Sequence, residues 1–322
     1  MTRVLTGIQS SGKPHLGNIL GAIIPAIKMS NNEKNESLFF IADLHSLTTL
    51  RNPSLIKENV YATAAAWLAF GFDTKKNIFY KQSDIPEVCE FTWYLNCFTP
   101  YPMLANAHSF KDKSDNLSNV NSGLFTYPVL MASDILMYDA NIVPVGKDQK
   151  QHVEMTRDIA GYVNNIYGEV LVLPESKIDS RVMTIPGLDG KKMSKSYNNC
   201  IDIFLPEKHL KKQIMKIVTE SLSLEEKKNP DSCNVFNIYK LIASKEKTEK
   251  LYNLYVNGNF GFGTAKKMLL DLILDTFSEN REKYNYLMSN KNIIDKELEI
   301  GSNKARKIAK EVLSRFKNSL GF

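Results

Sequence analysis

The sequence is short of cysteine, lacks a long apolar run, and has no excess of acidic residues. Its four cysteines show no Cys-x-x-Cys spacing and its five histidines are scattered, which argues against a disulfide framework and a structural zinc site. No stretch approaches the roughly eighteen apolar residues of a membrane-spanning helix. Met1-Thr2-Arg3-Val4 leads into a strand-like pattern rather than a signal peptide. We therefore expect a cytoplasmic protein without a membrane partner.

The charge is distributed unevenly along the 322 residues. Residues 1–204 hold 19 Lys and Arg against 20 Asp and Glu, whereas residues 205–322 hold 22 against 15. A basic C-terminal third suits a polyanion such as a nucleic acid, because each phosphate contact releases counterions. Lysine-rich helix faces exposed only to solvent are the alternative, so charge alone does not decide between the two.

Apolar patterning predicts an α/β domain followed by helices. Short apolar runs at 4–8, 38–43, 78–81 and 142–146 alternate with helical patterns, which is typical of a parallel sheet. The first helix has apolar residues at helical spacing from Leu16 to Ile27, and Pro25 should kink it. Beyond Asn199 only helical patterns occur, one starting near Pro206 and others over 234–256, 263–289 and 302–319.

The segment from Gly7 to Asn18 joins the first strand to the first helix. Free backbone N–H groups and the helix dipole favour an anion at such a helix start. Gly17 would let a nucleotide lie against the backbone, and His15 and Asn18 can donate hydrogen bonds from one face. Simple capping of the helix by these two side chains is the competing interpretation.

A glycine-bounded loop, Gly187 to Ser196, carries three lysines and two serines. Lysines on a mobile loop can neutralise the charge that grows on a departing pyrophosphate, which raises a rate rather than an affinity. Taken alone, a solvated basic loop is the simpler interpretation.

Tyr127, Met131, Asp134 and Tyr138 are spaced by four, three and four residues, which places them on one stripe of a helix beginning near Pro128. A carboxylate on an apolar face is costly unless a group donates to it. Asp134 would therefore accept an N–H from a ligand such as indole, or be capped by a local Arg or backbone group. An indole site would reject phenylalanine, which would leave the acid unpaired.

Read together, His15-Leu16-Gly17-Asn18 and Lys192-Met193-Ser194-Lys195-Ser196 resemble the two signatures of class I aminoacyl-tRNA synthetases. Thr126-Tyr127-Pro128, residues 131–136 and residues 145–158 are similar to bacterial tryptophanyl-tRNA synthetases. The likeness is dense in the α/β region and loose in the helical third. It implies a Rossmann-like catalytic domain over 1–204, a smaller helical anticodon-binding domain over 205–293, and a C-terminal helix, 294–322, packed back on the catalytic domain.

The resemblance also implies an activity and a set of residues. The chain would be a tryptophan–tRNA ligase that forms tryptophanyl-adenylate and pyrophosphate from L-tryptophan and ATP, then transfers tryptophan to the 3′-terminal ribose of tRNA(Trp). The implied catalytic residues are Lys113, Lys192 and Lys195. Those implied for ATP are Gln9, His15, Gly17, Asn18, Gly146, Asp148, Met193 and Ser194. Those implied for tryptophan are Leu5, His45, Tyr127, Met131, Asp134 and Gln149. Within these sets, Asp134 would accept the indole N–H and Met193 would lie by adenine.

Further implications concern partners and departures. Mg²⁺ would travel on the nucleotide phosphates rather than in a protein site, and the chain would form a homodimer. The aromatic stretch from Phe91 to Leu104 is either core or the dimer surface. Ser10 stands where the family usually has proline, and Leu5 stands where an aromatic residue often lines the indole pocket. The alternatives are the tyrosine synthetase, a small-molecule nucleotidyltransferase, and a regulatory RNA-binding protein derived from a synthetase.

Overall fold

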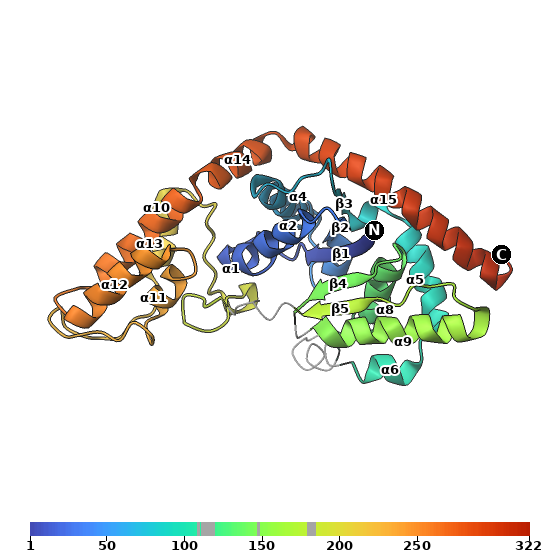
Figure 1. The fold of residues 1–322 in the computed structure, drawn as a ribbon, viewed down its shortest axis with the longest axis horizontal. Coiled ribbons are helices and arrows are strands. Elements are labelled where there is room, and N and C mark those ends of the chain that lie inside the picture. Colours follow the sequence, from blue (N-terminus) through green and yellow to red (C-terminus); the bar gives the residue numbers. More distant parts are fainter. Residues whose placement is uncertain (108–109, 111–119, 147–148, 179–184) are drawn as a thin grey trace.

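The computed structural model describes residues 1–107, 110, 120–146, 149–178 and 185–322. Within them lies a five-stranded parallel sheet of order β3-β2-β1-β4-β5, which confirms the predicted Rossmann-like architecture (Figure 1). The strands are β1 (Thr2–Gln9), β2 (Asn35–Ala42), β3 (Ile78–Lys81), β4 (Ile142–Val145) and β5 (Glu175–Ile178). Because all pairs are parallel, the carboxyl ends of the strands meet at one edge, where ligands bind in such sheets.

Strand β2, which lies between β3 and the central strand β1, shows why the sheet is buried on both faces. Phe39 and Ile41 pack into a core that continues into the C-terminal helices, while Leu38 and Phe40 pack into a second core on the opposite face. Successive side chains of a strand point to opposite faces, so a strand covered on both sides becomes an unbroken apolar run. This two-sided burial holds the strand ends in fixed positions.

The helix that follows β1 is interrupted near Pro25. It consists of α1 (Leu16–Asn18), a π-helical turn η1 (Ile19–Ile23) and α2 (Ile24–Ser30). Proline has no N–H to donate to the preceding turn, and a wide π-turn just upstream accommodates that missing bond. The distortion expected at Pro25 therefore occurs over the turn that precedes it.

Helices cover both faces of the sheet and then extend away from it. In the α/β region they are α3 (Asp43–Ser46), α4 (Pro53–Ala69), the 3₁₀ turn η2 (Gln82–Asp84), α5 (Glu87–Phe98), α6 (Tyr101–Ala105), α8 (Ser122–Leu136) and α9 (Lys150–Tyr167). The C-terminal ones are α10 (Glu207–Met215), α11 (Asn234–Tyr239), α12 (Lys245–Asn257), α13 (Phe262–Thr276), α14 (Ser278–Ser289) and α15 (Lys291–Leu320). No helix in the described ranges is both long and apolar enough to span a membrane.

Several predicted helix boundaries were wrong. Helix α8 begins at Ser122, because Asn121 caps it by accepting a 3.0 Å bond from the backbone N–H of Leu124, and Pro128 lies inside it. The single helices expected over 234–256 and 263–289 are each two helices. The last helix starts at Lys291, well before Ser302.

Helix α15 runs back along the sheet and packs on the edge strand β3 (Figure 1). At the crossing, Gly301 lies so close to β3 that a Cβ atom there would overlap the carbonyl oxygen of Phe79. Glycine permits this approach because it has no side chain. The edge of the sheet beside the candidate site is thereby covered.

Candidate active site

A cavity of about 1200 Å³ opens at the carboxyl-end edge of the sheet. Side chains from β1, α3, α8 and the end of β4 line it, as expected at the strand ends of a parallel sheet. The structure brings eight of the predicted residues together in this lining: Leu5, Gln9, His45, Tyr127, Met131, Asp134, Gly146 and Gln149.

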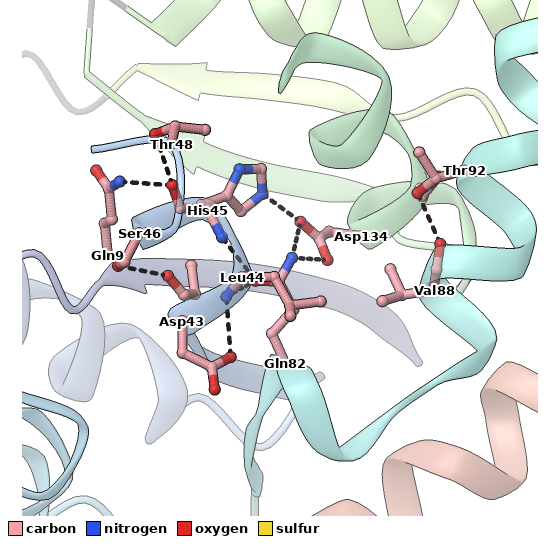
Figure 2. A network of polar contacts seen from close by, with 12 residues as sticks. Gln9, Asp43, Leu44, His45, Ser46, Thr48, Gln82, Val88, Thr92 and Asp134 are labelled. Atoms are coloured by element: carbon pink, nitrogen blue, oxygen red, sulfur yellow. Dashed lines mark hydrogen bonds and ion pairs between the residues drawn. The ribbon is translucent and has the colours of Figure 1, made fainter. Parts of the chain in front are cut away.

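Asp134 is a buried acid in the cavity lining, with 2% of its surface exposed. His45 donates from Nε2 to Oδ2 of Asp134 at 2.7 Å, and Gln82 donates from Nε2 to both carboxylate oxygens at 2.8 and 2.9 Å (Figure 2). Burial raises the pKa of Asp134, and the bonds from His45 and Gln82 oppose that rise. The donors are thus two side chains from strand ends, and not the arginine or backbone group considered as alternatives.

His45 is placed by its own backbone as well as by its ring. Its carbonyl oxygen accepts from Nε2 of Gln9 at 3.2 Å, which ties α3 to the end of β1. Its ring lies edge-on to Tyr127, with 4.5 Å between ring centroids. Since the carboxylate of Asp134 can only accept, Nε2 carries the proton, and Nδ1 is buried without a hydrogen-bond partner among the described residues. His45 thereby fixes the Asp134 carboxylate and the Tyr127 ring relative to each other.

His15 and Asn18 form a reciprocal cap at the start of α1. The backbone N–H of Asn18 donates to Nδ1 of His15 at 3.3 Å, and the N–H of His15 donates to Oδ1 of Asn18 at 3.1 Å. Burial and then the charge of Lys195 lower the pKa of His15 to about 4, so the ring is neutral and accepts at Nδ1. The capping interpretation is correct, and it leaves Nε2–H of His15 and the amide NH₂ of Asn18 as donors beside the helix terminus.

The loop from Gly187 to Ser196, called the lysine loop below, lies directly against the start of α1. The N–H of Gly17 donates to Sδ of Met193 at 3.2 Å, and Met193 is buried. The side chain of Lys195 crosses Gly12 so closely that a Cβ there would come 2.9 Å from its Cδ. Burial lowers the pKa of Lys195 to about 8, although part of the side chain stays exposed. The two predicted signatures therefore meet in space.

Asn199 organises the loop from inside. It is buried, its Oδ1 accepts from the N–H of Ser194 at 2.8 Å, and its Nδ2 donates to Oδ1 of Asp189 at 2.7 Å and to the carbonyl of Lys192 at 3.1 Å. We did not predict a role for Asn199 or for Gln82. The position of Gln82 just after an apolar strand could have indicated it, because polar residues at such strand ends face the ligand edge.

The remaining predicted residues fall into three groups. Lys192 is exposed, and the hydroxyl of Ser194 lies 2.8 Å from that of Ser196. Lys113 and Asp148 lie outside the described residues. Ser10, in place of the usual proline, is buried with its hydroxyl 3.3 Å from that of Ser46, which links the turn to α3.

Residues 1–278 match the family described as tRNA synthetases class I (W and Y), so the chain belongs to this family. The relatives are more specific. The chain is 46% identical to a tryptophan–tRNA ligase of Campylobacter jejuni, over 99% of both chains. It is 47% identical to one of Fusobacterium nucleatum, over 100% of this chain and 98% of the relative.

Solved structures agree. A crystal structure of tryptophanyl-tRNA synthetase from Campylobacter jejuni, complexed with ADP and tryptophan, matches with a TM-score of 0.95 and 46% identity over 100% of both chains. The enzyme from Mycoplasma pneumoniae matches with a TM-score of 0.82 and 30% identity, over 100% of this chain and 98% of that one. The resemblance noted from the two signatures is thereby confirmed for the whole chain.

Proposed function

We propose that this chain activates L-tryptophan with ATP and transfers it to the 3′-terminal ribose of tRNA(Trp). The chain is an aminoacyl-tRNA ligase, since its full-length relatives are tryptophan–tRNA ligases, and this origin favours tryptophan over tyrosine. The observation that carries the proposal is the buried Asp134 carboxylate, which lines a cavity at the same sheet edge as the joined phosphate-facing signatures.

Asp134 is suited to an indole N–H. A carboxylate has about four acceptor positions, and the bonds from His45 and Gln82 use three of them. One position on Oδ1 remains for the ligand. Leu5 and Met131 supply apolar walls, and Tyr127 and Gln149 would hold the substrate ammonium.

The chemistry joins the tryptophan carboxylate to the α-phosphorus of ATP and breaks the bond from that phosphorus to the bridging oxygen, releasing pyrophosphate. The ribose hydroxyl of the tRNA then attacks the adenylate carbonyl, and AMP leaves. His15, Asn18, Lys192, Ser194 and Lys195 would stabilise the phosphate charge, with Lys113 reaching the pyrophosphate. Gln9, Gly17, Gly146, Asp148 and Met193 would bind the rest of the nucleotide.

Mg²⁺ would accompany the nucleotide. The described residues contain no group of three His, Cys, Asp or Glu side chains that could hold a metal ion. By resemblance to the family, we propose that Mg²⁺ would be carried by the phosphates of ATP, where it would neutralise their charge.

The helical unit over 205–293 would contact the anticodon of the tRNA, supported by the basic excess of the C-terminal third. Lys245, Lys247 and Lys250 are exposed on α12. Charge reversal of these three lysines should raise the KM for tRNA and leave tryptophan-dependent pyrophosphate exchange unchanged. Charge reversal of Lys76, which is exposed and lies in the α/β region far from α12 in the sequence, is the control. An unchanged KM for tRNA would contradict this role for α12.

We further propose a homodimer that works in the cytoplasm, as the resemblance to the family implies. The stretch from Phe91 to Leu104 is divided: Phe91 and Leu95 are core, whereas Trp93 and Tyr101 are 69% and 71% exposed. Exposed aromatic residues of this kind mark association surfaces. Sedimentation should show a dimer that Trp93→Glu dissociates, while Tyr286→Glu on α14 does not. A wild-type monomer would refute the dimer.

The proposed activity is tested by charging bacterial tRNA with labelled amino acids and ATP. Labelled tryptophan should enter RNA, and labelled tyrosine and phenylalanine should not. Incorporation of tyrosine in place of tryptophan would refute the proposal.

A further inference from the structure

Gln82 is a buried amide that no predicted site includes. It follows β3 as the first residue of η2 and has 1% of its surface exposed. Its Oε1 accepts the backbone N–H groups of Leu44 and His45 at 3.1 and 3.4 Å. Its Nε2 donates to both oxygens of Asp134, so every contact of the amide joins α3 to α8 (Figure 2).

These contacts permit one orientation of the amide. Backbone N–H groups can only donate, so the carbonyl oxygen of Gln82 must face Leu44 and His45. The NH₂ group must then face the carboxylate. A flipped amide would place its oxygen against Asp134 and its NH₂ against two N–H donors, leaving buried groups unpaired at high cost.

We propose that Gln82 is a positioning residue that determines amino-acid specificity by holding the Asp134 carboxylate ionised and aimed at the ligand N–H. This inference rests on the proposed tryptophan activation. His45 supplies one donor to Asp134, and that bond reaches Oδ2 only. Gln82 is anchored at its other end by two backbone groups, so it fixes both carboxylate oxygens at once.

The other titratable groups around Asp134 do not supply charge in the working pH range. Burial raises the pKa of Tyr80 on β3 well above its usual value, and it also raises the pKa of Tyr138, which follows α8. Burial likewise raises the pKa of Cys89 on α5. These three groups stay protonated, so we assign the acid limb of tryptophan recognition to the Asp134 carboxyl.

The test replaces Gln82 by methionine, which has similar length and no donor. The kcat/KM for tryptophan in pyrophosphate exchange should fall about tenfold or more, because a hydrogen bond to a charged group is lost. Discrimination against phenylalanine should weaken, and the KM for ATP should stay the same. The acid limb of kcat/KM for tryptophan should move to higher pH, because the pKa of Asp134 rises when a donor is removed.

Ser83→Ala is the matched control, because the Ser83 hydroxyl bonds Asp43 at 2.6 Å and does not touch Asp134. Its tryptophan kinetics should match the wild type. In an Asp134→Asn background, Gln82→Met should add much less than its separate effect. An unchanged acid limb, or fully additive effects, would overturn the role of Gln82.

A second variant keeps the proposal testable if Gln82→Met lacks a cooperative thermal transition. Gln82→Glu can donate to Asp134 only when protonated, so its kcat/KM for tryptophan relative to wild type should increase as pH falls. A ratio independent of pH would overturn the proposal. Wild-type protein without tryptophan-dependent exchange would instead refute the proposed function itself, so the two failures are distinguishable.

Discussion

Nε2 of His45 lies 2.7 Å from Oδ2 of Asp134, although the two residues are 89 positions apart and come from α3 and α8. Both side chains are buried, and Gln82 completes the contact from η2, the turn that follows β3. This part of the cavity is thus built from α3, η2 and α8, which are far apart in the sequence. Substitutions at Asp134 should alter amino-acid selectivity more than they alter ATP binding.

Asp134→Asn should weaken tryptophan recognition and discrimination against phenylalanine and tyrosine. The loss of the charged acceptor corresponds to roughly 1.5–3 kcal/mol, or about ten- to a hundredfold in kcat/KM for tryptophan. Steady-state pyrophosphate exchange with each amino acid measures this loss of kcat/KM, and the KM for ATP should stay unchanged. Ser133→Ala serves as control, because Ser133 lies on the same helix as Asp134 and loses a 2.9 Å bond from the Thr92 hydroxyl on α5. Equal losses for tryptophan and ATP would count against Asp134 as the indole acceptor.

His15 should make the protein less stable in mild acid. Its folded pKa of about 4 lies below the 6.5 of an exposed histidine, so the unfolded chain binds this proton first. The contribution is fully present above pH 6.5 and is lost as pH falls from 6.5 towards 4. Thermal unfolding of His15→Asn should depend less on pH in this window than wild type. The exposed His209, replaced by Gln, should leave the dependence unchanged. Identical pH dependence in His15→Asn and wild type would contradict the buried neutral ring.

Lys195 should impose an alkaline limit on activation. Its pKa of about 8 means that the free enzyme loses this positive charge as pH rises through 8. The kcat/KM for ATP should fall there, and Lys195→Arg should remove that limb because a guanidinium does not titrate in this range. Lys195→Ala should lower kcat by roughly a hundredfold or more, as when one transition-state donor is removed. Lys191→Ala, an exposed neighbour, should keep the wild-type profile. A limb that survives in Lys195→Arg would exclude Lys195 as its origin.

Asn199→Ala should slow activation by releasing the lysine loop. Three bonds to Ser194, Asp189 and Lys192 are lost together, so kcat should drop by about tenfold or more while amino-acid preference is retained. Exchange kinetics with tryptophan and tyrosine report both quantities. Asn198→Gly is the control, since Asn198 has a φ of 50° that glycine adopts freely. Wild-type kcat in Asn199→Ala would show that the loop does not depend on this residue.

Gly301→Ala should destabilise the molecule, because the added methyl group overlaps the carbonyl oxygen of Phe79. Overpacking of this kind costs about 1–3 kcal/mol and lowers the thermal midpoint by several degrees. Gly263→Ala in α13 meets no atom within 4 Å and should raise the midpoint slightly. Similar midpoints for the two variants would mean that α15 does not lie tightly on β3.

Periodicity predicted most of the fold because burial on both faces leaves unbroken apolar runs such as β2. It missed β5, because the sequence Glu-Ser-Lys-Ile has a single apolar residue and therefore no alternation to detect. It also merged α11 with α12, although Ser244 caps the second helix by accepting from the N–H of Lys247 at 3.3 Å. Local propensity continues across such breaks, and tertiary packing decides where they fall.

Only part of the site could be predicted from the sequence, for a similar reason. Asp134 could be identified from its own helix stripe, since spacing reveals which residues share a face. Its donors could not, because the meeting of His45 and Gln82 depends on the adjacency of β2 and β3, which only the strand order establishes. The likeness to a known family supplied roles for Lys113 and Asp148, which lie outside the described residues and stay predictions.

Activation of tryptophan can be measured by amino-acid-dependent exchange of labelled pyrophosphate into ATP, run with each of the standard amino acids in turn. Exchange should be rapid with L-tryptophan and slower by roughly a hundredfold or more with tyrosine or phenylalanine. Rapid exchange with tyrosine, or no exchange with any amino acid, would contradict the proposed activation of tryptophan.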